Sequence, residues 1–119
     1  MSVAHDDSLI IRIWYEIALC AINSRASDIH IEARITGTLV RLRVDGLLQE
    51  HSHHSPELHE RLITRIKILA RLDIAEKRLP QDGRLSIGRD FSQPDIDCRV
   101  SLLPTLYGEK AVIRILPNQ

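Results

Sequence analysis

Residues 38–46 read Thr-Leu-Val-Arg-Leu-Arg-Val-Asp-Gly, and this stretch decides the fold class. Apolar and polar side chains alternate along it, which is the period of a β-strand with one buried face. The Asp-Gly pair at its end is typical of a tight hairpin turn, because both residues tolerate positive φ. Residues 28–32 (Asp-Ile-His-Ile-Glu) alternate in the same way, and residues 47–51 should return as a third antiparallel strand. The side chains expected on the buried face are Ile29, Ile31, Val40, Leu42 and Val44, and those expected outward are His30, Glu32, Arg41 and Arg43.

A helix is predicted on either side of these three strands. Residues 8–24 carry apolar side chains at helical spacing, after an Asp-Asp-Ser start at residues 6–8 that would cap the helix. Residues 55–72 begin with Ser-Pro-Glu, which is a typical helix start. The stripe expected to be buried in this second helix is Leu58, Leu62, Ile66, Leu69 and Ala70.

The remainder of the chain predicts further strands. A charged connector at residues 73–84 should turn the chain at its Asp-Gly pair, and a short strand should follow at residues 84–87. A polar turn at residues 88–95 then leads to alternating strands at residues 95–101 and 111–116. The order is α-βββ-α-βββ, which predicts an α+β fold with two main helices and a mainly antiparallel sheet of about six strands. The length fits a single domain over residues 1–119.

Composition excludes several classes of protein. Apolar residues make up 44% of the chain, which excludes disorder, and 16 basic residues balance 16 acidic ones, so no global field attracts nucleic acid or anionic lipid. The longest apolar stretch, residues 9–22, is interrupted by Arg12 and Glu16, so it is too short and too charged to span a bilayer. We expect a cytoplasmic chain with no nucleic-acid partner and no membrane insertion. Cys20 and Cys98 both lie in apolar-patterned stretches and are predicted to be buried thiols.

The last two predicted strands hold the sharpest candidate site. If the loop between them is centred near Leu106, Arg99 lies opposite or diagonal to Arg114 on one face of the sheet. Like charges that face each other across a sheet cost stability unless a negative group bridges them. Two explanations remain open at this point: acids such as Asp97 and Glu109 nearby, or a bound anion such as a phosphate.

Other catalytic and metal-binding patterns are missing from the sequence. Residues 83–88 have the glycine spacing of a phosphate-binding loop, but Arg89-Asp90 follows where Lys and Ser or Thr belong. We see no carboxylate pair for acid–base chemistry and no setting for a nucleophile. We expect no metal site either, because no acid or thiolate stands at ligand spacing from the histidines His51, His53, His54 and His59.

Several motifs, in unbroken order, closely resemble one protein family. They are Ala-Ser-Asp-Ile-His-Ile-Glu at residues 26–32, Arg-Leu-Arg-Val-Asp-Gly at 41–46, Arg-Ile-Lys-Ile-Leu-Ala-Arg-Leu-Asp-Ile-Ala-Glu-Lys-Arg-Leu-Pro-Gln-Asp-Gly-Arg at 65–84, Cys-Arg-Val-Ser at 98–101, Leu-Pro-Thr at 103–105, Gly-Glu at 108–109 and Val-Ile-Arg-Ile-Leu at 112–116. The chain thus resembles the secretion ATPases of bacterial type II secretion and type IV pilus assembly (general secretion pathway protein E-like). The resemblance covers about residues 7–116. It is to the PAS-like α+β domain that precedes the RecA-like catalytic domain.

The resemblance implies a place inside a hexameric motor. In that family this domain packs beside the RecA-like domain, and two of its arginines reach the ATP phosphates; the matching positions here are Arg99 and Arg114. Arg78 and Arg84 are further candidates for subunit or nucleotide contacts. Mg²⁺ would be held by the catalytic domain, so we expect no cofactor on this chain alone. The implied partners are that domain, neighbouring subunits and inner-membrane platform proteins, with a cytoplasmic location peripheral to the inner membrane.

The sequence departs from the family pattern at three places. It ends before the Walker A and Walker B boxes, residues 88–95 form a longer turn than usual, and Lys110 stands where the family has Arg. We therefore expect that this chain alone does not hydrolyse ATP. The alternative hypothesis is a stand-alone PAS-like module that binds a ligand or a protein and has no motor function.

Overall fold

The computed structural model describes residues 3–88 and 95–117, with side chains described from residue 8 onward. Its helices and strands follow the predicted α-βββ-α-βββ order, which confirms the α+β fold class. The elements are α1 (Val3–Asn23), β1 (Asp28–Arg34), β2 (Gly37–Val44), β3 (Leu47–His54), α2 (Pro56–Leu69), β4 (Gln81–Ile87), β5 (Ile96–Thr105) and β6 (Gly108–Ile115). Within the described part of the chain, no helix is long and apolar enough to cross a lipid bilayer.

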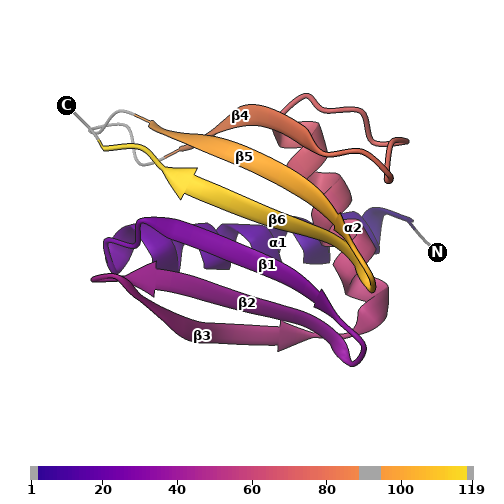
Figure 1. Ribbon diagram of the computed structural model, residues 1–119, viewed down its shortest axis with the longest axis horizontal. Helices are drawn as coiled ribbons and strands as arrows, with labels where there is room; N and C mark the ends of the chain where they lie inside the picture. The colour runs from indigo at the N-terminus through magenta and orange to yellow at the C-terminus, as the bar shows by residue number, and fades with distance from the viewer. Residues whose placement is uncertain (1–2, 89–94, 118–119) are drawn as a thin grey trace.

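The six strands form one antiparallel sheet in the order β3-β2-β1-β6-β5-β4. β1 and β6 pair at its centre, where Ile29 faces Ile113, and this pairing joins the two groups of three consecutive strands. Both helices lie on the same face of the sheet (Figure 1). We call the helix-covered side the inner face and the opposite side the outer face.

The inner face carries the hydrophobic core. Side chains that alternate along β1, β2, β4, β5 and β6 pack against the buried stripes of the two helices, as the period-two pattern predicts. Each fully buried Ile, Leu or Val contributes about 1.5–3 kcal/mol relative to an exposed position. The fully buried members of this core include Ile17, Ala21, Ile29, Ile31, Val40, Leu62, Ile66, Cys98, Val100, Leu102, Ala111 and Ile113.

Several predicted boundaries differ from the structure: β4 begins at Gln81, β5 extends to Thr105 and β6 begins at Gly108. α1 begins at Val3, so the Asp-Asp-Ser segment at residues 6–8 lies inside the helix and does not cap it. β3 extends to His54, three residues beyond the predicted end. α2 ends at Leu69 because Arg71 adopts a left-handed φ of 58° and the N–H of Leu72 bonds back to the carbonyl of Lys67 at 2.8 Å. The N–H of Arg71 also bonds to the carbonyl of Ile68 at 3.2 Å. The two bonds end the helix in a Schellman motif.

The turn predicted at Asp82-Gly83 is wrong. Both residues belong to β4, where Asp82 pairs with Ser101 and Gly83 with Val100. A Cβ at Gly83 would lie 2.8 Å from the Leu72 side chain and 3.0 Å from the Ala70 carbonyl. The glycine is therefore needed where the strand passes close to the end of α2, and its presence does not indicate a turn.

The two cysteines lie in different environments. Cys98 is buried as predicted, and burial, with a smaller effect of the Asp97 charge, raises the pKa of its thiol to about 12. Cys20 is exposed on α1, so the prediction that it is buried is wrong. It follows Leu19 on the side of the helix that faces away from the core. The predicted polar turn at residues 88–95 lies outside the described residues except at its two ends.

A buried ion pair fixes α2 to the sheet. Lys67 has only 1% of its surface exposed, and its Nζ lies 2.7 Å from Oε1 of Glu109 on β6. The same Nζ donates to the carbonyl of Glu76 at 2.6 Å. His59 lies about two helical turns before Lys67 on α2. It bonds through Nε2 to the carbonyl of Glu109 at 2.7 Å and through Nδ1 to Thr38 Oγ1 at 2.9 Å. Since a carbonyl only accepts, Nε2 carries the proton.

Replacing Lys67 with Met should destabilise the fold by about 3–5 kcal/mol, because the Glu109 carboxylate then stays buried without its cation. The double variant Lys67→Met/Glu109→Met should lose much less than the sum of the two single variants. Urea unfolding followed by Trp14 fluorescence measures both quantities. Additive losses in the double variant would show that the two side chains do not depend on each other.

Candidate functional site

The outer face of the sheet is lined mainly by charged and polar side chains. Because alternate residues of a strand point to opposite faces, the residues before and after each core residue of a strand point to the outer face. Residues facing one another across the strand pairs extend this surface over all the strands. Its members on the central strands and on β4 and β5 are Asp28, His30, Glu32, Leu39, Arg41, Arg43, Asp82, Arg84, Ser86, Asp97, Arg99, Ser101, Lys110, Val112 and Arg114.

Three arginines lie in a line across the outer face. Arg84 on β4 pairs with Arg99 on β5, and Arg99 pairs with Arg114 on β6. The register therefore confirms that Arg99 and Arg114 face each other directly. We call Arg84, Arg99 and Arg114 the arginine row. Neighbouring strands are about 4.8 Å apart, so the backbones of β4 and β6, which carry the two ends of the row, are about 10 Å apart.

The acids beside the arginine row do not neutralise it. Asp82 and Asp97 each accept a hydrogen bond from a serine hydroxyl of the neighbouring strand, at 2.9 and 3.0 Å. Within residues 8–88 and 95–117, no carboxylate forms an ion pair with Arg84 or Arg99. Facing like charges across a sheet are unfavourable. The described structure thus leaves two adjacent guanidinium groups available for an external anion.

Glu109, one of the acids proposed to neutralise Arg99 and Arg114, lies on the other face. Strand β6 begins at Gly108, so alternation places Glu109 inward together with Ala111, opposite Pro104. Glu109 is 8% exposed, and its carboxylate pairs with Lys67. Glu109 is therefore not one of the nearby acids that the first of the two explanations requires.

The carboxylate that does reach the row is Asp28, at the start of β1. Its Oδ1 accepts from Arg114 Nε at 3.3 Å, and its Oδ2 accepts from Arg43 Nε at 3.0 Å. Sequence reasoning missed this role because the contact with Arg114 joins residues 86 positions apart. The alternating pattern of residues 28–32 predicts that Asp28 faces outward. It does not predict that β6 is the strand beside β1.

A second cluster of charges surrounds Glu32. Its carboxylate accepts from Arg34 at 2.8 Å and from Arg41, and Lys110 Nζ lies 3.7 Å away. Burial acts to raise the pKa of Glu32, but the hydrogen bonds from the two arginines outweigh it and bring the pKa down to about 2. Glu32 is therefore ionised across the physiological range and holds β1, β2 and β6 together.

His30 separates the two charge clusters on β1. Burial lowers the pKa of this histidine, and the charge of Lys110 adds to the effect. Neither ring nitrogen has a hydrogen-bond partner among the described residues. An imidazole whose pKa is lowered thus lies on β1 between Asp28 and Glu32.

Arg78 is not part of the arginine row. It lies in the connector between α2 and β4, where its backbone N–H donates to Glu76 Oε2 at 2.7 Å. Arg84, where the predicted connector ends and the predicted strand begins, belongs to β4. Of the four arginines singled out from the sequence, the structure brings Arg84, Arg99 and Arg114 together.

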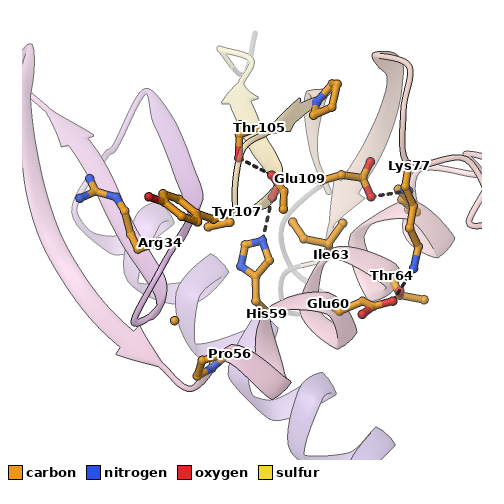
Figure 2. Close-up of a pocket in the computed structure, with 15 residues that line it drawn as sticks. Arg34, Pro56, His59, Glu60, Ile63, Thr64, Lys77, Thr105, Tyr107 and Glu109 are labelled. Atoms are coloured by element: carbon orange, nitrogen blue, oxygen red, sulfur yellow. Dashed lines mark hydrogen bonds and ion pairs between the residues drawn. The ribbon is translucent and has the colours of Figure 1, made fainter.

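A cavity of about 240 Å³ lies on the inner side, between α2 and the turns that join β1 to β2 and β5 to β6. Figure 2 shows Ile63 and Thr64 from α2 on one wall and Tyr107 on another, with the Glu109 carboxylate at its side. Lys77 pairs with Glu60 at the rim. No member of the arginine row lines this cavity, so the two features are separate.

The histidines do not form one group. His51, His53 and His54 lie on β3, whereas His59 is buried on α2. In the part of the chain that the structure describes, no three His, Cys, Asp or Glu side chains are arranged to hold a metal ion.

Glu32→Gln should destabilise the fold by about 1–3 kcal/mol at pH 7, since it removes charge-assisted hydrogen bonds. The folded-state pKa of about 2 lies below the ordinary value of 4.5. This contribution is therefore fully present above about pH 4.5 and is lost as the pH falls toward 2. Urea unfolding of both proteins at a series of pH values measures the difference. A gap that stays constant down to pH 2 would contradict the assignment.

Comparison with known proteins places the chain among secretion proteins. It matches the family described as "Type II/IV secretion system protein" over residues 3–119. Type II secretion system protein E of Pseudomonas aeruginosa is 49% identical over 117 residues, which cover 96% of this chain and 22% of that protein. Type IV pilus assembly ATPase PilB of Myxococcus xanthus is 43% identical over 116 residues, covering 98% of this chain and 20% of that protein.

A putative type II secretion system protein E of Escherichia coli strain K12 is 49% identical over 107 residues, covering 90% of this chain and 21% of the relative. The chain thus spans about a fifth of the length of the relatives that it matches. A family match from residue 3 to residue 119, together with these identities, shows that the chain belongs to the type II/IV secretion system protein family.

Proposed function

We propose that this chain is a non-catalytic regulatory domain that contacts the nucleotide in a hexameric secretion or type IV pilus assembly ATPase. The observation that supports this most directly is the arginine row on the outer face. Arg84 and Arg99 face each other there without a carboxylate partner among the described residues. An anion that is supplied from outside the chain would relieve their repulsion.

The chemistry of the row suits phosphate groups. Each guanidinium offers planar donors that match two phosphate oxygens at once, and its charge does not titrate at physiological pH. Three such groups over about 10 Å can contact more than one phosphate of an ATP molecule. Since negative charge on the transferring phosphoryl group must be stabilised in the transition state, these donors would also accelerate hydrolysis.

The remaining parts of the active site would come from elsewhere in the assembly. A RecA-like catalytic domain, of the same protein or of a neighbouring subunit, would bind ATP and its Mg²⁺ and face the outer face of this sheet. Closure of the two domains would bring the arginine row to the phosphates, and opening would withdraw it. This relative movement would couple hydrolysis to mechanical work. Arg78, in the connector, would contact a neighbouring subunit.

The location follows from the same proposal. The nucleotide and the catalytic domain would be cytoplasmic, and the assembly would attach to inner-membrane platform proteins of the secretion or pilus machine. This chain would reach the membrane only through those partners.

A second candidate function is supported by the cavity beside α2. A volume of about 240 Å³ with mixed apolar and polar walls is large enough for a small ligand or a partner's side chain. In that case the chain would be a stand-alone PAS-like binding module, and the arginine row would not matter to it. Titration of the chain with the catalytic domain of a relative separates the two functions. Association that strengthens with ATP supports the motor domain, and its absence supports the binding module.

The proposed function predicts that Arg99→Ala or Arg114→Ala lowers ATPase activity by about tenfold to a thousandfold, as loss of a charge-stabilising donor does in other enzymes. Arg84→Ala should lower it by about tenfold or more for the same reason. The measurement is steady-state ATP hydrolysis by the Pseudomonas aeruginosa relative in which this chain replaces the segment that it matches.

The matched control for these variants is Arg12→Ala, which removes an exposed arginine from α1 and should leave the rate within about twofold of wild type. Near wild-type turnover in both the Arg99 and Arg114 variants would overturn the assignment. A loss in all of them, Arg12→Ala included, would point to general damage to the protein.

A further inference from the structure

Asp28 has an unusual position within the arginine row. It is the first residue of β1, and the sheet register places it directly opposite Arg114 on one side and Arg43 on the other. Its side chain is only 8% exposed, whereas 70% of the Arg114 side chain is exposed. A buried carboxylate thus lies beneath a guanidinium that extends to solvent.

Both arginine contacts of this carboxylate use Nε, the guanidinium nitrogen nearest the side-chain stem. Asp28 Oδ2 also accepts from the Ser27 hydroxyl at 3.5 Å and lies 4.0 Å from His30 Nε2. Arg114 and Arg43 each donate from Nε, at 3.3 and 3.0 Å. Arg43 also donates from Nη1 to the Gly46 carbonyl at 3.1 Å. The Arg114 side chain has no other hydrogen bond among the described residues, so its two terminal nitrogens remain available.

We propose that Asp28 is a positioning residue, which holds Arg114 by Nε so that its terminal nitrogens point outward to a phosphate. The inference rests on the proposed function of the arginine row. An arginine loses rotamer freedom when it binds a ligand, and this loss weakens the binding. A carboxylate that fixes the side chain beforehand removes most of that loss from the binding step.

A simple charge effect predicts the opposite result, which makes the proposal testable. Asp28 carries a negative charge close to the anion site, so its removal should strengthen phosphate binding if only Coulomb energy matters. If Asp28 positions Arg114, its removal should weaken binding even though the site becomes more positive. The sign of the change therefore distinguishes the two roles.

The experiment titrates the chain with inorganic tripolyphosphate and follows the backbone and arginine Nε–H signals by NMR. Asp28→Asn, which keeps the shape but not the charge, should weaken binding about threefold to tenfold. The matched control is Asp97→Asn, which removes a carboxylate from the same face that bonds only to Ser86 among the described residues. It should strengthen binding by up to about twofold, as a charge effect requires.

A second variant tests the route through Nε. Arg114→Lys keeps the charge but has no Nε for Asp28 to hold, so it should bind tripolyphosphate more weakly. Adding Asp28→Asn to Arg114→Lys should cause no further weakening. Asp28→Glu, which keeps the carboxylate, should restore part of the loss seen in Asp28→Asn. Equal or tighter binding by Asp28→Asn than by wild type would overturn the proposal.

The Nε–H signal of Arg114, identified by its absence in Arg114→Lys, separates this inference from the proposed function. In wild type it should exchange with water about tenfold more slowly than in Asp28→Asn. If tripolyphosphate does not bind wild type at all, the phosphate role of the row fails, and the exchange rate alone decides the positioning. An Nε–H exchange rate unchanged by Asp28→Asn would then overturn it.

Discussion

The pairing of β1 with β6 at the centre of the sheet is the constraint on which both faces depend. It joins two groups of three consecutive strands, which the chain builds on either side of α2. On the inner face it brings Ile29 against Ile113, and on the outer face it brings Asp28 against Arg114. A shift of this pairing by one residue would exchange the two faces of one half of the sheet relative to the other. The core and the arginine row therefore require the same register.

Local patterns in the sequence predicted much of this arrangement. Period-two alternation placed Arg41 and Arg43 outward, and the position of the final loop placed Arg99 opposite or diagonal to Arg114. The turn signal at Asp82-Gly83 failed because glycine is needed there for close packing against the end of α2, a tertiary contact. The partner of Arg114 also could not be read locally, since nothing near Asp28 in the sequence indicates which strand lies beside β1.

Two carboxylates show how the choice of face decides a role. Glu109 was expected in a loop, where its side chain could reach the arginines, but β6 starts early enough to turn it inward toward Lys67. Lys67 itself lies on the buried stripe of α2, and its helical spacing from Ile63 was the available signal. Asp28 points outward and remains with the arginines. One acid thus stabilises the packing of helix on sheet, and the other shapes the candidate site.

The arginine row runs from the edge of the sheet to its middle. β4 has a neighbouring strand on one side only, whereas β6 has one on both sides. Backbone amides of edge strands open more readily than those of central strands, so protection from hydrogen exchange should rise from Arg84 to Arg114. The backbone that carries the three guanidinium groups therefore becomes more rigid from β4 to β6. Under the proposed function, the β6 end of the row would hold a ligand in a fixed position, and the β4 end would adjust to a surface that approaches it.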